Sequence, residues 1–168
     1  MDYAQRIFVQ ARAGTPNNPG FSDALASLLV AQARHETGDF KSNFFRNNNN
    51  AFGYAYYSGS LYQTGAGGIA DNGQPIAHYA TIEDSTKEII DWIWRRYRAG
   101  QFPEPSTIET PEQYAKALKA AKYYGDTLEN YLRGLRAFFK PIAAIQGAGL
   151  ILAIVALAYL YKRGTLRL

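Results

Sequence analysis

The stretch from Ile142 to Tyr161 is apolar, and its 20 consecutive residues include no Asp, Glu, Lys or Arg. A helix of that length, rising about 1.5 Å per residue, crosses the roughly 30 Å hydrocarbon core of a bilayer. Basic residues flank the stretch on both sides, which leaves its orientation open, and tyrosines lie near its end. The sequence therefore predicts a transmembrane helix over residues 141–163 and a short basic tail over 164–168, with a buried core helix as the alternative.

Residues 1–140 are numerous enough for one domain, and the chain is 47% hydrophobic and 14% aromatic. Cysteine is absent, which excludes disulfides, thiol nucleophiles and thiolate metal sites. His35 and His78 are the only histidines and no HExxH spacing occurs, so we expect neither a metal nor a cofactor. The net charge of +4 suits an anionic partner, but the basic residues are dispersed, so we expect no nucleic acid.

Four helices are predicted where capping residues precede apolar residues at helical spacing. Their N-terminal signals are Ser22 or Asp23, Thr81 with Asp84, Thr110 with Pro111 and Gln113, and Asp126 with Glu129. The first of these helices is expected to end near Gly38, and the second to cover about 82–98. Between them, from Asn47 to Ala80, the composition changes to Asn, Gly, Tyr and Ser. We predict a small β-hairpin lobe there, with strands at Tyr54–Tyr57 and Ile76–Tyr79. The fold class is therefore mainly α, a helical domain with a β lobe.

Glu36 is the most informative residue of the domain. At 100° per residue it lies within about 40° of Leu25 and Leu29, so it continues the apolar face of its helix. Desolvation and the negative end of the helix dipole both disfavour a carboxylate there, and both raise its pKa. A carboxyl group that keeps its proton near neutral pH can act as a general acid on a glycosidic oxygen. The alternative is that Glu36 is a surface residue or is paired with Arg34 or Arg46.

Four segments resemble one family. Ala31 to Gly38, followed by Lys41-Ser42 and the Asn-Asn-Ala-Phe-Gly-Tyr segment 49–54, resembles the AQAxxESGxGKS and NNxFG signatures of glucosaminidases in the lysozyme-like superfamily. These are the flagellar and autolytic wall hydrolases of glycoside hydrolase family 73. Tyr79 to Ser85 resembles the entry of that family into a core helix, and Ala115 to Tyr131 resembles its ending. The resemblance covers about residues 20–140.

The resemblance implies a lysozyme-like α+β fold and an enzyme that cleaves the glycan strands of peptidoglycan. It makes Glu36 the catalytic acid and places Tyr123 or Tyr124 near the reactive sugar. Phe52 and Gly53 would shape the floor of the glycan groove, and aromatic rings of the lobe would stack on sugars. The substrate-binding residues that we predict are Gln32, Asn50, Phe52, Gly53, Tyr54 and Tyr79.

The second catalytic group is less defined, because Asp71 is the only acidic residue between Phe40 and Thr81. Members of the family often place a second carboxylate in the β lobe. Asp71 is either the base that activates water or a turn residue, since Asp-Asn-Gly is strong turn chemistry. If no second carboxylate approaches Glu36, the acetamido group of the substrate takes its place, as in substrate-assisted glycosidases.

The predicted function is hydrolysis of β-1,4 bonds of peptidoglycan by a membrane-anchored N-acetylglucosaminidase. The alternatives are a lytic transglycosylase, which uses the same acid, and a catalytically inactive glycan-binding or structural membrane protein. A wall hydrolase without an evident secretion signal but with a C-terminal anchor suggests a phage enzyme that opens the wall locally. We therefore expect it in the membrane of a lipid-containing virion, with membrane or capsid proteins as partners, or alternatively in the bacterial inner membrane.

Overall fold

The computed structural model describes residues 1–70 and 72–140 of the chain. The predicted membrane span, the basic tail and Asp71 lie outside these residues. Within the described ranges, no helix is both long and apolar enough to cross a bilayer.

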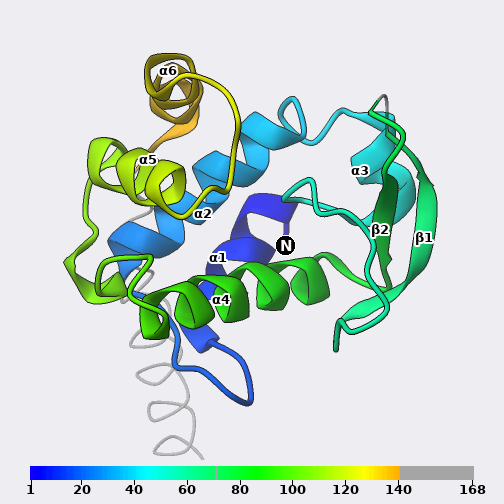
Figure 1. The fold of residues 1–168 in the computed structure, drawn as a ribbon, viewed down its shortest axis with the longest axis horizontal. Coiled ribbons are helices and arrows are strands. Elements are labelled where there is room, and N and C mark those ends of the chain that lie inside the picture. The colour runs from blue at the N-terminus through cyan, green and yellow to red at the C-terminus, as the bar shows by residue number, and fades with distance from the viewer. Residues whose placement is uncertain (71, 141–168) are drawn as a thin grey trace, which may run out of the picture.

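Helices dominate the described part of the chain, and a two-stranded sheet lies at one side of them (Figure 1). In chain order the elements are α1 (Tyr3–Ala13), α2 (Asp23–Glu36), α3 (Asn43–Asn48), β1 (Gln63–Ile69), β2 (Pro75–Tyr79), α4 (Ile82–Arg98), the 3₁₀ turn η1 (Pro105–Thr107), α5 (Pro111–Ala120) and α6 (Leu128–Phe138). The structure confirms the predicted fold class, which is mainly α with a small antiparallel β lobe.

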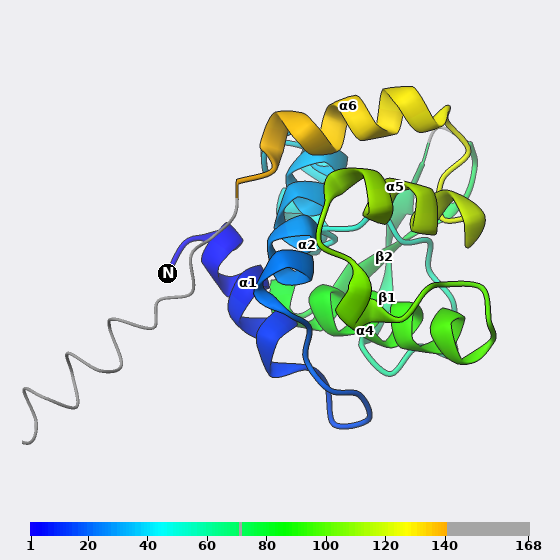
Figure 2. The ribbon, with the colours of Figure 1, turned by 90° about the vertical axis from the view of Figure 1, so that its left-hand side faces the viewer.

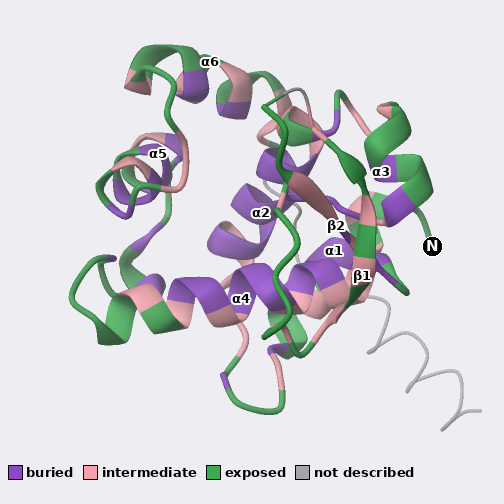
Figure 3. Ribbon diagram, turned by 45° about the vertical axis from the view of Figure 1, so that its right-hand side comes forward, coloured by how far each residue is buried: buried purple, intermediate pink, exposed green. Residues whose placement is uncertain are grey.

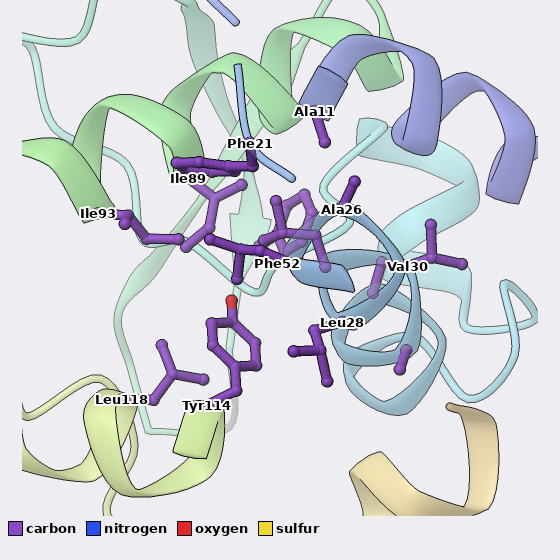
Figure 4. Close-up of a cluster of buried hydrophobic side chains, with 14 of the residues drawn as sticks. Ala11, Phe21, Ala26, Leu28, Val30, Phe52, Ile89, Ile93, Tyr114 and Leu118 are labelled. Atoms are coloured by element: carbon purple, nitrogen blue, oxygen red, sulfur yellow. The ribbon is translucent and has the colours of Figure 1, made fainter. Parts of the chain in front are cut away.

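Helix α2 forms the centre of the domain. It contacts α1, α5 and α6, and it is buried along most of its length (Figure 3). Apolar side chains of α1, α2, α4 and α5 meet in one cluster, into which the Tyr114 hydroxyl points (Figure 4). Because every face of α2 up to Ala33 is enclosed, the helix leaves the core only in its last turn, and that turn carries Glu36.

Three of the predicted helix starts are confirmed, and the fourth needs a correction. Ser22, Thr81 and Thr110 each accept a backbone N–H three residues ahead, which satisfies one of the free donors of the first turn. The N-cap of α6 is Thr127 and not Asp126, because the Thr127 hydroxyl accepts the N–H of Asn130. The Asp126 carboxylate instead accepts the Thr127 N–H, one residue before the helix.

The predicted first strand is wrong, although the second, at Ile76–Tyr79, is confirmed within β2. Tyr54–Tyr57 makes only an isolated bridge, between Ala55 and Ile76, and the strand that pairs with β2 is Gln63–Ile69. The sequence conceals that strand because three of its seven residues are glycines, which have low strand propensity.

Helix α3 was not predicted, because its Asn-rich end reads as a loop. The helix ends at Asn49, whose φ of 51° is left-handed, and the Asn49 amide donates to the carbonyls of Tyr79 and Ala80. The asparagine run therefore ties the chain to β2.

Glu88 of α4 fastens the β lobe to the helices. Its carboxylate is 3% exposed and accepts four hydrogen bonds, from the hydroxyls of Tyr57, Ser60 and Tyr79 and from the amide of Gln63. These donors come from the loop before β1, from β1 itself and from β2. One buried side chain thus fixes the lobe that forms one wall of the site described next.

Candidate active site

Glu36 lies in a pocket of about 480 Å³ between the α5–α6 side of the molecule and the loop that precedes the β lobe. The residues that line this pocket, called here the central pocket, are His35, Glu36, Phe52, Gly53, Tyr54, Ala55, Trp92, Lys122, Tyr123, Tyr124, Gly125, Asp126 and Tyr131. In Figure 1, α5 and α6 lie on one side of the end of α2, and the β lobe lies on the other. The structure thus brings together segments that lie up to 95 residues apart in the chain.

The Glu36 carboxylate is open to solvent, although protein atoms surround it on the other sides. Its side chain is exposed in the pocket, which corrects the expectation that it continues the buried face of α2. The surrounding protein still removes water from around the carboxylate, and this desolvation raises its pKa above the ordinary value, as predicted. Arg34 pairs with Asp39 at 2.7 Å and not with Glu36. Within the described residues, Glu36 makes no ion pair.

Tyr131 holds the Glu36 carboxylate directly. Its hydroxyl donates to Glu36 Oε1 at 2.8 Å, and the ring is 4% exposed and stacked on Tyr124 with centroids 3.7 Å apart. This hydrogen bond favours the ionised carboxylate, so it lowers the Glu36 pKa and partly offsets desolvation. Tyr131 is not among the site residues predicted from the sequence, although it is the last residue of the family-like segment Ala115 to Tyr131.

Gly134 explains how α6 comes close enough for that contact. A Cβ at Gly134 would lie 2.2 Å from the His35 ring, so only glycine fits at this helix crossing. The His35 ring packs edge-on against Tyr131, with centroids 5.1 Å apart. Figure 2 shows α6 running across the end of α2. The close crossing of α2 and α6 sets the position of the Tyr131 hydroxyl.

The two predicted catalytic tyrosines both line the pocket, but their hydroxyls are engaged with the backbone. Tyr123 donates to the Phe52 carbonyl at 2.5 Å, and Tyr124 donates to the Ala115 carbonyl at 3.0 Å. Tyr123 also packs edge-on against Tyr54 and Trp92. Tyr123 therefore joins the α5–α6 loop to the opposite wall across the pocket floor.

Phe52, Gly53 and Tyr54 form that opposite wall, where the sequence places part of the glycan site. Gly53 has a φ of 65°, and a Cβ built on it would lie 3.7 Å from Glu36 Oε2. The backbone thus passes close to the carboxylate in a conformation that glycine adopts at little cost. Tyr54 lines the pocket with its ring, while its hydroxyl is buried without a hydrogen-bond partner among the described residues.

Three predicted substrate-binding residues are buried, which corrects the prediction that they contact substrate. Gln32 is 0% exposed and accepts the Tyr114 hydroxyl. Tyr79 is also 0% exposed and donates to Glu88. Asn50 is 5% exposed, and its amide group bonds the backbone of Tyr54 and Ala77. These polar groups satisfy buried partners, so they position the walls of the site without reaching its surface.

Asp71 and Asp126 are the two candidates for a second catalytic carboxylate. Asp71 lies outside the described residues. Within them, no other carboxylate acts electrostatically on Glu36, whose pKa responds to desolvation and Tyr131. Asp126 lines the pocket, and hydrogen bonds from Asn130 and the Thr127 N–H lower its pKa, so it is ionised at neutral pH. Our sequence reasoning missed Asp126 as a site residue, although it closes the Tyr-Tyr-Gly-Asp part of the family-like ending.

No metal site accompanies this pocket in the part of the chain that the structure describes. There, no three His, Asp or Glu side chains are grouped so that they could hold an ion.

A helical domain with a small β lobe and an acid in the cleft between them is the arrangement of lysozyme-like glycoside hydrolases. The family comparison is more specific, because the glucosaminidase model, described as mannosyl-glycoprotein endo-β-N-acetylglucosaminidase, matches residues 21–143. The chain belongs to this glucosaminidase family and is a glycoside hydrolase.

Solved structures support the same fold, each with a TM-score of 0.54. The peptidoglycan hydrolase from Sphingomonas sp. A1 is 20% identical, and the match covers 79% of this chain and 81% of that one. The truncated glycoside hydrolase domain of Salmonella typhimurium FlgJ is 22% identical, with 82% and 93% covered. A chain of a type VI secretion effector–immunity complex from Pseudomonas protegens is 16% identical, with 82% and 91% covered. No curated protein matches the chain.

Proposed function

We propose that this glucosaminidase hydrolyses the β-1,4 bonds of peptidoglycan glycan strands on the N-acetylglucosaminyl side, with Glu36 as the general acid. The observation that carries the proposal is the state of Glu36, which is open to the pocket and has a pKa raised by desolvation. A carboxyl group in that state holds a proton at a place that a substrate can reach. The positive net charge of the chain suits an acidic wall polymer.

In the proposed first step, the Glu36 carboxyl donates its proton to the glycosidic oxygen as the bond from that oxygen to C1 breaks. The carboxylate that remains is stabilised by the hydrogen bond from the Tyr131 hydroxyl, 2.8 Å from Oε1. The leaving sugar departs as a neutral alcohol, and positive charge develops at C1 of the N-acetylglucosaminyl residue. Tyr131 thereby strengthens its interaction with Glu36 as the reaction proceeds, which is the condition for lowering a barrier.

For the second step we propose that the acetamido oxygen of the substrate stabilises C1 until water attacks. A retaining enzyme with a protein nucleophile places two carboxyl groups about 5–5.5 Å apart. Among the described residues, Asp126 is the other carboxylate that lines the central pocket, and desolvation and the Tyr131 hydrogen bond are the causes of the shift in the Glu36 pKa. Asp126 and Asp71 are the competing candidates for a base. Under this proposal, Asp126→Asn and Asp71→Asn each retain activity within about tenfold, whereas loss of a general base costs about 10² to 10⁴.

The decisive experiment is digestion of purified peptidoglycan by the full chain in detergent, with Glu36→Gln beside the wild type and mass spectrometry of the products. Reducing N-acetylglucosamine ends that carry one added water support the proposal. Reducing N-acetylmuramic ends would place the cut at the other bond, and anhydro ends would make the enzyme a lytic transglycosylase. If a folded wild type releases nothing, the chain binds glycan without cleaving it.

We also propose that residues 142–161 anchor the enzyme in a membrane, so that it cleaves the wall locally, as a phage with a lipid-containing virion requires. The support is the 20-residue uncharged stretch with basic residues on both sides. The anchor predicts that the full chain floats with liposomes in a density gradient after a high-salt wash, while a chain ending at residue 140 does not. Flotation of both would assign membrane binding to the domain. Purified virions without zymogram activity for this chain would remove the phage role and leave the bacterial inner membrane.

A further inference from the structure

The central pocket continues into further hollows on both sides, so the cleft is a groove with two different ends. On the β-lobe side, a hollow shares Gly53, Tyr54 and Ala55 with the central pocket and reaches the β1–β2 turn. On the opposite side, a hollow of about 420 Å³ shares Lys122. This second hollow, called here the basic hollow, is lined by Arg96, Gly100, Gln101, Ala120, Ala121 and Lys122.

Two cations line the basic hollow, and no carboxylate does. Arg96 and Lys122 make no ion pair within residues 1–70 and 72–140. Other cations of the described residues do pair with carboxylates, as Arg6 pairs with Glu83 and Arg136 with Glu112. Two positive charges at one edge of a groove therefore remain available to an anion in the substrate.

The chain holds the Arg96 side chain in place, and it places the backbone of Lys122 at the edge of both the central pocket and the basic hollow. Arg96 is half-buried, its guanidinium lies over the Trp92 ring 5.3 Å from the centroid, and its Nη1 donates to Gln101 at 2.5 Å. A guanidinium has further N–H donors beside Nη1, which can bind a carboxylate in the paired manner typical of arginine. Lys122 has a left-handed φ of 58°, which is unfavourable for a residue with a Cβ. The fold keeps it there, between the central pocket and the basic hollow.

We propose that the basic hollow binds a carboxylate of the stem peptide on the sugar next to the cleaved bond, so that the enzyme prefers glycan strands with acidic peptides. The inference rests on the proposed function and adds a substrate feature to it. Lys122 places the anion beside the reactive sugar, because it lines both the central pocket and the basic hollow. An acidic peptide fits the hollow better than a neutral glycan, since uncharged sugars gain little from two unpaired cations.

The test compares native strands, freed of other anionic polymers, with the same strands after their peptide carboxylates are converted to amides. The full chain and its Arg96→Gln/Lys122→Asn variant are assayed on both, and Asn is chosen because it tolerates a left-handed φ. We expect amidation to lower wild-type kcat/KM about tenfold, and the double variant to lose about the same on native strands. In the variant, amidation should cost less than about twofold, since the two changes remove one interaction.

Arg46→Gln/Lys116→Gln is the matched control, because it removes two exposed cations that line neither the central pocket nor the basic hollow. The control should respond to amidation as the wild type does. The proposal would be overturned if amidation lowered kcat/KM of the double variant as much as it lowers that of the wild type. It would also be overturned if amidation left the wild-type kcat/KM unchanged.

A binding assay separates failure of this inference from failure of the proposed function. Glu36→Gln full chain is titrated with soluble native and amidated strands. If the wild type cleaves nothing but binding still weakens about tenfold on amidation, peptide binding in the basic hollow is supported and the proposed hydrolysis is refuted. If cleavage occurs and the two kinds of strand bind equally, the proposed hydrolysis is supported and peptide binding in the basic hollow is refuted.

Discussion

Two glutamates on neighbouring sides of the groove differ in what surrounds them. Glu88 on α4 is 3% exposed and receives four hydrogen bonds from the β lobe. Glu36 at the end of α2 is exposed and receives one, from Tyr131. Both carboxylates accept hydrogen bonds from uncharged donors. They differ in the number of these hydrogen bonds and in the exposure of the side chain to solvent.

The difference shows how a carboxylate is assigned to structure or to chemistry. Four donors occupy the acceptor positions of Glu88, whose side chain is buried. Glu36 keeps Oε2 free and faces the pocket, while desolvation raises its pKa. Burial of the side chain alone would have selected Glu88 as the unusual residue. The unoccupied oxygen and the open pocket select Glu36.

The largest expected effect separates the two residues by activity. Glu36→Gln should lower kcat/KM on peptidoglycan about 1,000-fold, because an amide cannot donate a proton to the leaving oxygen. Glu88→Gln should keep activity per folded molecule within about fivefold, since it does not touch substrate. Product release by both variants, with circular dichroism to confirm folding, measures the contrast. An equal loss of activity in both variants would show that Glu36 and Glu88 do not differ in their importance for catalysis.

Stability should show the reverse contrast. Glu88→Ala leaves the buried hydroxyl of Tyr79 and three further donors without their acceptor, so we expect the free energy of unfolding to fall by about 3 kcal/mol. Glu36→Gln keeps a side-chain oxygen that can accept the Tyr131 hydroxyl, so it should change the free energy of unfolding by less than about 1 kcal/mol. Urea unfolding of the full chain in detergent checks both values. A stable Glu88→Ala variant would mean that the β lobe is held by other contacts.

The Tyr131 hydrogen bond should appear as a shift in the pH profile. Tyr131→Phe removes a donor that lowers the Glu36 pKa, so the pKa should rise. Because the acid must be protonated, the alkaline limb of kcat/KM should move to higher pH, while the maximum falls about tenfold as the carboxylate loses its stabilising partner. Tyr124→Phe, whose hydroxyl bonds the Ala115 carbonyl, is the control and should leave the limb in place. An unmoved limb in Tyr131→Phe would show that the contact serves packing only.

The smallest expected effect is a pH-dependent stability difference at Glu36 itself. Its pKa is higher in the folded than in the unfolded chain, so folding is penalised as pH rises from the unfolded pKa through the folded one. Glu36→Gln does not titrate and escapes the penalty. It should equal the wild type below about pH 4 and be slightly more stable at pH 7, by less than about 1 kcal/mol because the group is solvent-exposed. Thermal unfolding at the two pH values tests the sign.

The helices could be predicted because their signals are local. Thr81 and Thr110 cap α4 and α5 as the sequence indicates, since a hydroxyl three residues before a free N–H is sufficient. The strands of the β lobe could not be predicted in this way, because their pairing depends on residues that lie far apart in the sequence. Tyr54–Tyr57 has strand-like residues but no ladder, whereas glycine-rich β1 pairs with β2 under the constraint of Glu88.

The sequence by itself determined the family, the position of Glu36 in its motif and the direction of its pKa shift, since these depend on residue order and helix periodicity. The tertiary structure alone decided which side chains reach the site. Tyr131 meets Glu36 across 95 residues because Gly134 lets α6 cross close to α2. Asn50 and Tyr79 turn inward, where the packed fold supplies partners for their buried polar groups, and Gln32 accepts the Tyr114 hydroxyl there.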